Sequence, residues 1–233
     1  MGSAHTEGVL AQLRHSPAAS NPLLKGALSH LAAEIARRAK ASSDPGFFVE
    51  AVEVLTGIRG SQHAALRMQA LSDCIPALYA GGQIGPALKA ATELCRLSEA
   101  VQGDSWQRIA YTATGILLAD VGDITTAISH HVRAIEIARK LNDRGGEIRA
   151  AINLGVALNY AGLFREAVPC FRRSIEMCSV DVEDQRQFRS TALSNLSRSY
   201  YWLGEFEEGM RTIFASIEGA PASRPFLSIL HNT

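Results

Sequence analysis

The chain has 233 residues, of which 47 % are hydrophobic and 20 % are charged, so it can bury a core and is not compositionally disordered. Its 23 acidic and 23 basic residues balance, which gives no electrostatic argument for a nucleic-acid partner. No apolar run approaches the roughly 20 residues that span a bilayer, and no secretory signal opens the chain. Four cysteines form no C-x-x-C pair, which excludes a zinc ribbon and a redox motif, and they lie in apolar helical patterns that suit free thiols in a reducing cytoplasm. We expect a cytoplasmic protein with no membrane partner.

The N-terminal part of the chain is expected to hold a lead-in and one pair of helices. Residues 1–20 are small, polar and unpatterned, which predicts a flexible N-terminal segment. Asn21 and Pro22 then suit a helix start, because asparagine caps a helix and proline is tolerated at its first position. Apolar residues follow at helical spacing, and a second helix is predicted after Asp44-Pro45-Gly46. We interpret residues 21–60 as a degenerate helical hairpin or an N-terminal cap.

The rest of the chain repeats itself, and this self-similarity is the strongest signal in the sequence. The segments 111–127, 151–167 and 193–209 share one pattern of apolar and small residues. A glycine recurs at Gly82, Gly122, Gly162 and Gly204, so the residue number rises by 40, 40 and 42 between copies. Such a glycine suits the end of a helix, where a left-handed backbone is usual.

These segments resemble the tetratricopeptide repeat family, and the middle copy carries the clearest matches: Leu154, Gly155, Leu158, Gly162, Ala167 and Phe171. The resemblance implies an all-α fold, a right-handed α-solenoid of antiparallel helix hairpins, with four repeats in residues 61–220. The usual repeat has about 34 residues, so either the helices or the loops between them must be longer here.

Two prolines and the end of the chain add detail to this picture. Pro76 lies inside a predicted first helix and predicts a kink, whereas Pro169 lies near the start of a second helix. Residues 221–233 are interpreted as a loop and the start of a further, truncated repeat. We hypothesise that the sequence is a fragment, or a truncated relative, of a longer protein.

No group of residues forms a catalytic constellation. His131 falls at the position of Phe171, which favours packing, and His30 with Glu34 lacks a third metal ligand. The pair Gly81-Gly82 follows no strand and precedes no Gly-Lys-Ser/Thr, so it indicates a turn. We therefore predict that the protein is not an enzyme and has no catalytic residue, metal site or cofactor.

In this family the first helix of each repeat lines a concave groove, and the resemblance places seven residues of this chain on it. They are Arg149, Asn153, Val156, Asn159, Asn195, Arg198 and Tyr201. An asparagine amide both donates and accepts, so it can hold a peptide backbone without reading its sequence. The alternatives are that the asparagines cap nearby backbone or face water, and that Tyr201 or Trp202 packs.

The leading hypothesis is a non-enzymatic interaction scaffold that binds a peptide or partner helix in this groove. An alternative is the N-terminal sensory or regulatory region of a larger bacterial signalling protein, such as a diguanylate cyclase or a transcriptional regulator. Abundant arginine and scarce lysine are typical of a GC-rich bacterial genome. A helical-solenoid enzyme is a third reading, but it would need a converging acidic or histidine cluster. Self-association through the solenoid ends is also expected, because a terminal repeat exposes apolar surface.

Overall fold

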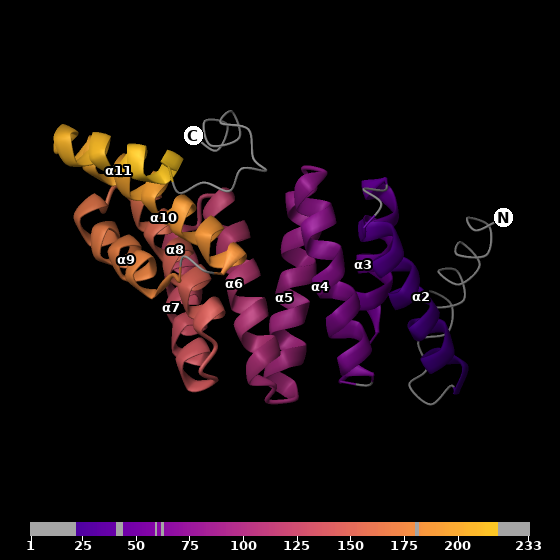
Figure 1. Cartoon of the computed structure of the whole chain (residues 1–233). Coiled ribbons are helices and arrows are strands. Elements are labelled where there is room, and N and C mark those ends of the chain that lie inside the picture. The colour runs from indigo at the N-terminus through magenta and orange to yellow at the C-terminus, as the bar shows by residue number, and fades with distance from the viewer. Residues whose placement is uncertain (1–21, 41–43, 59, 62, 180–181, 219–233) are drawn as a thin grey trace. The chain divides into compact units, whose positions relative to one another are not determined.

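A computed structural model describes residues 22–40, 44–58, 60–61, 63–179 and 182–218, and these form ten helices and no strand (Figure 1). The helices are α2 (Pro22–Lys40), α3 (Pro45–Gly57), α4 (Ala64–Ala80), α5 (Ile84–Ala100), α6 (Asp104–Asp120), α7 (Ile124–Lys140), α8 (Arg144–Tyr160), α9 (Phe164–Met177), α10 (Glu183–Trp202) and α11 (Phe206–Glu218). The all-α class is confirmed. The predicted segments 1–20 and 221–233 lie outside the described residues. Within the described ranges, no helix is both long and apolar enough to cross a membrane.

The helix lengths explain the regular spacing of the turn glycines. Each helix from α4 to α8 has 17 residues, and each turn from 81–83 to 161–163 has three. Two such helices and two such turns make one step, so the extra length over the usual repeat lies in the helices. The last step is longer because a longer connection follows the end of α9 at Met177, and because α10 has 20 residues.

The turn glycines have the conformation that the sequence predicts. Gly82 and Gly162 have φ of +70° and +74°, in the left-handed region that glycine enters without a steric penalty. The backbone N–H of the residue after the glycine donates to a carbonyl in the last turn of the helix, as Leu163 N does to Leu158 O at 2.9 Å. This bond caps the C-terminal end of the helix. At the turns after α5 and α7 the left-handed residues are Gln102 and Asn142, with φ of 51° and 53°.

The chain divides into two compact units, residues 1–117 and residues 118–233. In the first unit α2 and α3 both pack on α4, and α3 also contacts α5 (Figure 1). The core of this unit includes the fully buried side chains of Phe48, Leu71 and Leu94. Arg67 lies within it, and its guanidinium donates to Leu55 O at 3.0 Å and to Gly60 O at 2.7 Å.

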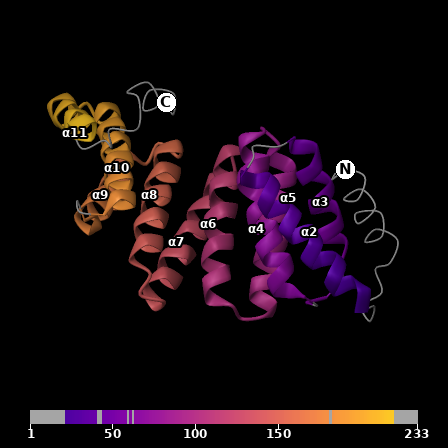
Figure 2. The same cartoon turned by 45° about the vertical axis from the view of Figure 1, so that its right-hand side comes forward.

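In the second unit α8 packs against α7, α9 and α10, and α10 in turn packs against α9 and α11 (Figure 2). Ile148, Ile152, Phe171 and Leu196 form the centre of its core. Because a single hairpin cannot bury its apolar face, each helix pair here depends on its neighbour.

Neither proline ends its helix. Pro76 lies inside α4, which continues to Ala80, and Pro169 is the sixth residue of α9. The kink at Pro76 stays a prediction. Asp44 starts α3 as expected for the Asp-Pro-Gly sequence, since its carboxylate accepts from Gly46 N at 2.9 Å.

Candidate partner-binding surface

The seven residues that the sequence placed on a groove lie on α8 and α10, two neighbouring helices of the second unit. On α8, Arg149 is exposed, while Asn153 and Val156 are partly buried. These three residues are spaced at i, i+4 and i+7, so they share one side of the helix. Val156 also packs against the core of the unit, which gives this side of α8 a firm base.

Asn159 differs from its neighbours because it faces α10. Its side chain is 8 % exposed, Ser199 Oγ donates to its Oδ1 at 2.9 Å, and its Nδ2 approaches Asn195 O at 3.4 Å. A buried amide with these bonds has little surface left for a partner. We therefore propose that Asn159 positions α8 against α10, and we omit it from the candidate surface.

Asn153 and Asn195 occupy equivalent places in their repeats but have different surroundings. Asn195 Nδ2 donates to Thr191 O at 3.0 Å, one turn earlier on the same helix. This is the backbone capping that the sequence left open as an alternative. Asn153 makes no side-chain hydrogen bond with any residue in the described part of the chain, so its donor and acceptor are both available to a ligand.

Arg149 bridges α8 and α10. Its guanidinium carbon lies 5.2 Å from the ring centroid of Phe188, within the range of a cation–π contact. This contact holds the arginine over α10 and next to the partly buried asparagines. Arg198 also makes an interaction within the protein.

Tyr201 belongs to a row of aromatic rings at the end of α10. Its ring packs edge-on against Trp202 at 5.6 Å and against Phe206 at 5.7 Å, and Trp202 stacks on Phe164 at 5.8 Å. We call these four residues the aromatic row. Tyr201 and Trp202 are 60 % and 61 % exposed, so both lie at the surface. Sequence reasoning named neither Phe164 nor Phe206 as their neighbours, since three helix ends must meet to bring them together.

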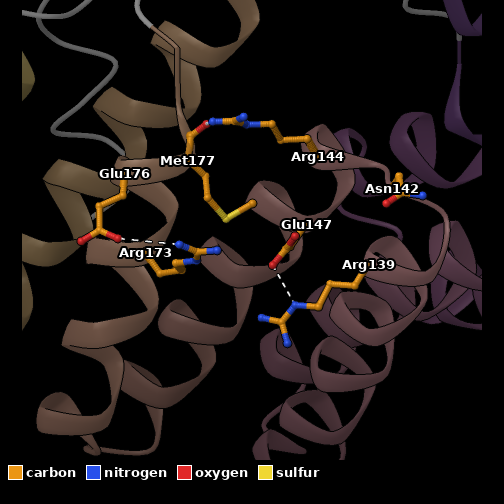
Figure 3. A pocket seen from close by; sticks show the side chains of 7 residues that line it. All are labelled: Arg139, Asn142, Arg144, Glu147, Arg173, Glu176 and Met177. Atoms are coloured by element: carbon orange, nitrogen blue, oxygen red, sulfur yellow. Dashed lines mark hydrogen bonds and ion pairs between the residues drawn. The ribbon is translucent and has the colours of Figure 1, made fainter.

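The second unit also has a cavity of about 440 Å³ between the turn before α8 and the end of α9 (Figure 3). It is lined by Arg139, Asn142, Arg144, Glu147, Arg173, Glu176 and Met177.

The charged residues of this cavity are mostly engaged with the protein itself. Arg139 Nε lies 2.8 Å from Glu147 Oε1, and the Arg144 guanidinium donates twice to Met177 O, at 2.9 and 2.7 Å. Arg144 thereby satisfies a carbonyl that the end of α9 would otherwise leave without a donor. The Arg144 bonds hold the start of α8 to the end of α9, and the Arg139–Glu147 pair joins the end of α7 to α8. No motif in the sequence indicates these contacts.

The four cysteines are buried or partly buried. Burial raises the pKa of the Cys74, Cys95, Cys170 and Cys178 thiols, which favours the unreactive protonated form. In the described ranges, no three His, Cys, Asp or Glu residues gather where a metal ion could bind.

Comparison with known proteins agrees with this geometry. Residues 106–179 match the family model of the tetratricopeptide repeat, so the resemblance is confirmed for this stretch. No curated protein matches the sequence significantly.

Solved structures extend the similarity of fold to most of the chain. A kinesin-light-chain-type protein of Podosopora anserina with nearly identical TPR-like repeats is 16 % identical, with a TM-score of 0.63, and the match covers 82 % of this chain and 93 % of that one. BtubC from P. vanneervenii is 16 % identical with a TM-score of 0.62, over 95 % and 93 % of the two chains. A Rap protein complexed with Competence and Sporulation Factor is 15 % identical with a TM-score of 0.64, over 94 % of this chain and 66 % of that chain.

Proposed function

We propose that this chain, whose residues 106–179 match the tetratricopeptide repeat, is a non-enzymatic scaffold that binds a protein segment along α8 and α10. The observation that carries the proposal is the unengaged amide of Asn153, which lies on the same side of α8 as Arg149 and Val156. An amide donor and acceptor beside an apolar side chain suits a peptide or partner helix, whose backbone and side chains present both kinds of group.

The remaining residues of the surface complete this chemistry. The side-chain Nδ2 of Asn195 donates to Thr191 O, which fixes the side chain. The side-chain Oδ1 of Asn195 is left as an acceptor for a partner. Arg149, held over Phe188, supplies a cation for a carboxylate. Arg198 and Tyr201 extend the same surface toward the end of α10.

The test begins with the intact protein used as bait in a native lysate, followed by mass spectrometry of what it captures. The recovered partner is then purified and its affinity measured by calorimetry against the wild type and the double variant Asn153→Ala/Asn195→Ala. Each hydrogen bond contributes about 1 kcal/mol net, so the loss of one bond at each asparagine is expected to weaken binding about thirtyfold. Asn142→Gly is the matched control, because it removes an exposed asparagine outside this surface. Equal affinities for the wild type and the double variant would rule out this surface.

A regulatory version of the proposal has one supporting observation. The Rap protein of similar fold was solved with Competence and Sporulation Factor, and this chain spans 66 % of it. We propose, as the second candidate, that the repeats are the input region of a larger bacterial signalling protein. Reading the gene beyond the codon for Thr233 tests this, since a continuing frame that encodes a cyclase or DNA-binding domain is expected.

A further inference from the structure

The aromatic row exposes more ring surface than the fold requires. Tyr201, Trp202 and Phe206 are each about 60 % exposed, while the core of the second unit is formed by other residues. Neighbouring exposed apolar side chains often mark an interaction site. The rings touch one another and come from the start of α9, the end of α10 and the start of α11.

The equivalent positions of the other repeats are aromatic only in part: Tyr79 stands at the place of Tyr201, and Tyr160 and Phe164 stand at the places of Trp202 and Phe206. Counting from the turn glycine, the places of Tyr201, Trp202 and Phe206 correspond to Ala119, Asp120 and Ile124 two repeats earlier. Those residues occupy the same kind of helix end, so the turn forms without aromatic side chains. The row is therefore a local feature of the last two hairpins in the described part of the chain.

Three glutamates lie close to the row in the sequence. Glu205, Glu207 and Glu208 are exposed and follow Trp202 closely, and between residues 201 and 211 Arg211 is the single basic residue. Arg211 lies 2.7 Å from Glu208 and 3.8 Å from Glu207. Glu205 makes no side-chain hydrogen bond or ion pair with a described residue, and it lies in the turn between Trp202 and Phe206. Arg165 and Glu166, beside Phe164, balance each other.

We propose that the aromatic row docks an arginine side chain from an extended segment of a protein partner, with Glu205 as its counter-ion. A guanidinium is planar and weakly hydrated, so it can stack on a ring face while its N–H groups pair with a carboxylate. A lysine ammonium lacks the flat face and the fork of donors, so it fits the same place less well. The inference rests on the proposed function and names the chemistry of the partner for it.

The test uses capped hexaarginine, hexalysine and hexaglutamate peptides as probes of the full chain. Trp106 and Trp202 are the two tryptophans, so a Trp106→Phe background makes the fluorescence report on Trp202. We expect saturable quenching by hexaarginine, about two- to fivefold weaker binding of hexalysine, and none by hexaglutamate. Equal binding of the two basic peptides would overturn the proposal, because charge alone would then explain it. Calorimetry on the wild type provides the same comparison without the Trp106 substitution.

Two substitutions locate the binding. Trp202→Ala removes a ring and Glu205→Gln removes the counter-ion, and each is expected to weaken hexaarginine binding about two- to fivefold. Tyr79→Ala is the matched control, because Tyr79 is the equivalent of Tyr201 in the repeat of Gly82 and is also exposed, at 44 %. Unchanged affinity in both row variants, or an equal loss in Tyr79→Ala, would overturn the proposal.

Failure of this inference is distinguishable from failure of the proposed function. Asn153→Ala/Asn195→Ala should leave hexaarginine binding unchanged, because neither asparagine belongs to the aromatic row. If the captured partner needs those asparagines while hexaarginine does not bind, the arginine inference is wrong and the scaffold proposal stands. If hexaarginine binds at the row while the asparagine variant keeps full partner affinity, the α8–α10 surface is wrong.

Discussion

The ring of Phe171 on α9 fills the space where a side chain on Gly155 of α8 would begin. A Cβ atom placed on Gly155 would lie 2.6 Å from Cζ and 2.7 Å from Cε1 of Phe171. Phe171 is fully buried, so its ring has no free space to enter. The glycine thus sets how closely the two helices of this hairpin approach.

We expect Gly155→Ala to lower the free energy of unfolding by about 1–3 kcal/mol, because overpacking displaces a buried ring. Urea unfolding followed by circular dichroism measures the change. Gly85→Ala is the control, since no atom lies within 4 Å of a Cβ at that exposed helical position, and helix propensity predicts no loss there. If the two variants lose equal stability, the contact with Phe171 is not the cause.

Removing the buried cation of the first unit, Arg67, should lower the free energy of unfolding by more than Gly155→Ala does. Arg67 is 0 % exposed, and its guanidinium lies 2.6 Å from Glu93 in addition to its two backbone carbonyl partners. Arg67→Ala leaves the carbonyls of Leu55 and Gly60 without this donor and opens a cavity, while Glu93 keeps its bonds from Arg96. We therefore expect a loss of about 3–5 kcal/mol in thermal or urea unfolding.

The exposed pair Lys89 and Glu53, also 2.6 Å apart, provides the comparison for Arg67. Exposed ion pairs contribute about 0–1 kcal/mol, so Lys89→Ala should change stability little. A loss from Lys89→Ala as large as that from Arg67→Ala would contradict the assignment of the effect to burial.

His131 predicts a dependence of stability on pH. Burial, with a smaller contribution from the charge of His130, lowers the pKa of His131 to about 4. The unfolded chain takes up this proton near pH 6.5. The unfolded state therefore binds more protons between these values, and stability falls as the pH drops from about 6.5 to 4.

We expect this histidine to account for roughly 3 kcal/mol of that loss. His131→Phe, which copies the residue at the equivalent position 171, should flatten the decline of urea midpoints measured from pH 7 to pH 4.5. A variant slope as steep as that of the wild type would assign the acid sensitivity to other groups.

The turns between repeats offer a stabilising change. Gln102 has φ of 51°, a conformation that costs a residue with a side chain about 1 kcal/mol and costs glycine little. We expect Gln102→Gly to raise the free energy of unfolding by several tenths of a kcal/mol. Asn142→Gly should gain less, because asparagine tolerates the left-handed region better. A net loss in Gln102→Gly would mean that its side chain contributes more than its backbone costs.

The buried amide of Asn159 separates stability from binding. Asn159→Ala removes the bond from Ser199 Oγ at 2.9 Å and the bond to Asn195 O at 3.4 Å, and leaves the Ser199 hydroxyl with Asn195 O as its acceptor. We expect about 1–2 kcal/mol of destabilisation in urea unfolding. Asn153→Ala, two turns away on the same helix and without a side-chain hydrogen bond to a described residue, should cost little. If Asn153→Ala destabilises as much as Asn159→Ala, Asn153 is also a structural residue.

The sequence predicted most of the fold because its strongest signals are local. A glycine that recurs at a helix end predicts a left-handed residue in the turn. Four such glycines have positive φ: Gly82, Gly122, Gly162 and Gly204. The assignment of His131 to packing also followed from repeat alignment, and its side chain is 1 % exposed. The fold class was confirmed for the same reason.

The candidate partner-binding surface was harder to predict, because the exposure of each side chain depends on which residues of neighbouring helices pack against it. Asn153 and Asn159 lie six residues apart on α8 and so face about 120° apart around its axis, but helical spacing alone does not say that α10 covers the side of Asn159. Phe164 and Phe206 lie far apart in the sequence, and their place in one row depends on the rings of Trp202 and Tyr201 between them. The periodicity of the sequence does not predict such contacts between side chains of different helices.

The bond between Asn159 and Ser199 also bears on how such an array evolves. The positions equivalent to this pair one repeat earlier are Ala119 and Ala157, which carry no polar side chain. A duplication or reshuffling that placed Asn159 next to a copy with alanine would leave its carbonyl oxygen buried without a donor. Although the repeats look alike in sequence, this hydrogen bond makes the hairpin of Asn159 fit the hairpin that follows it better than the other copies.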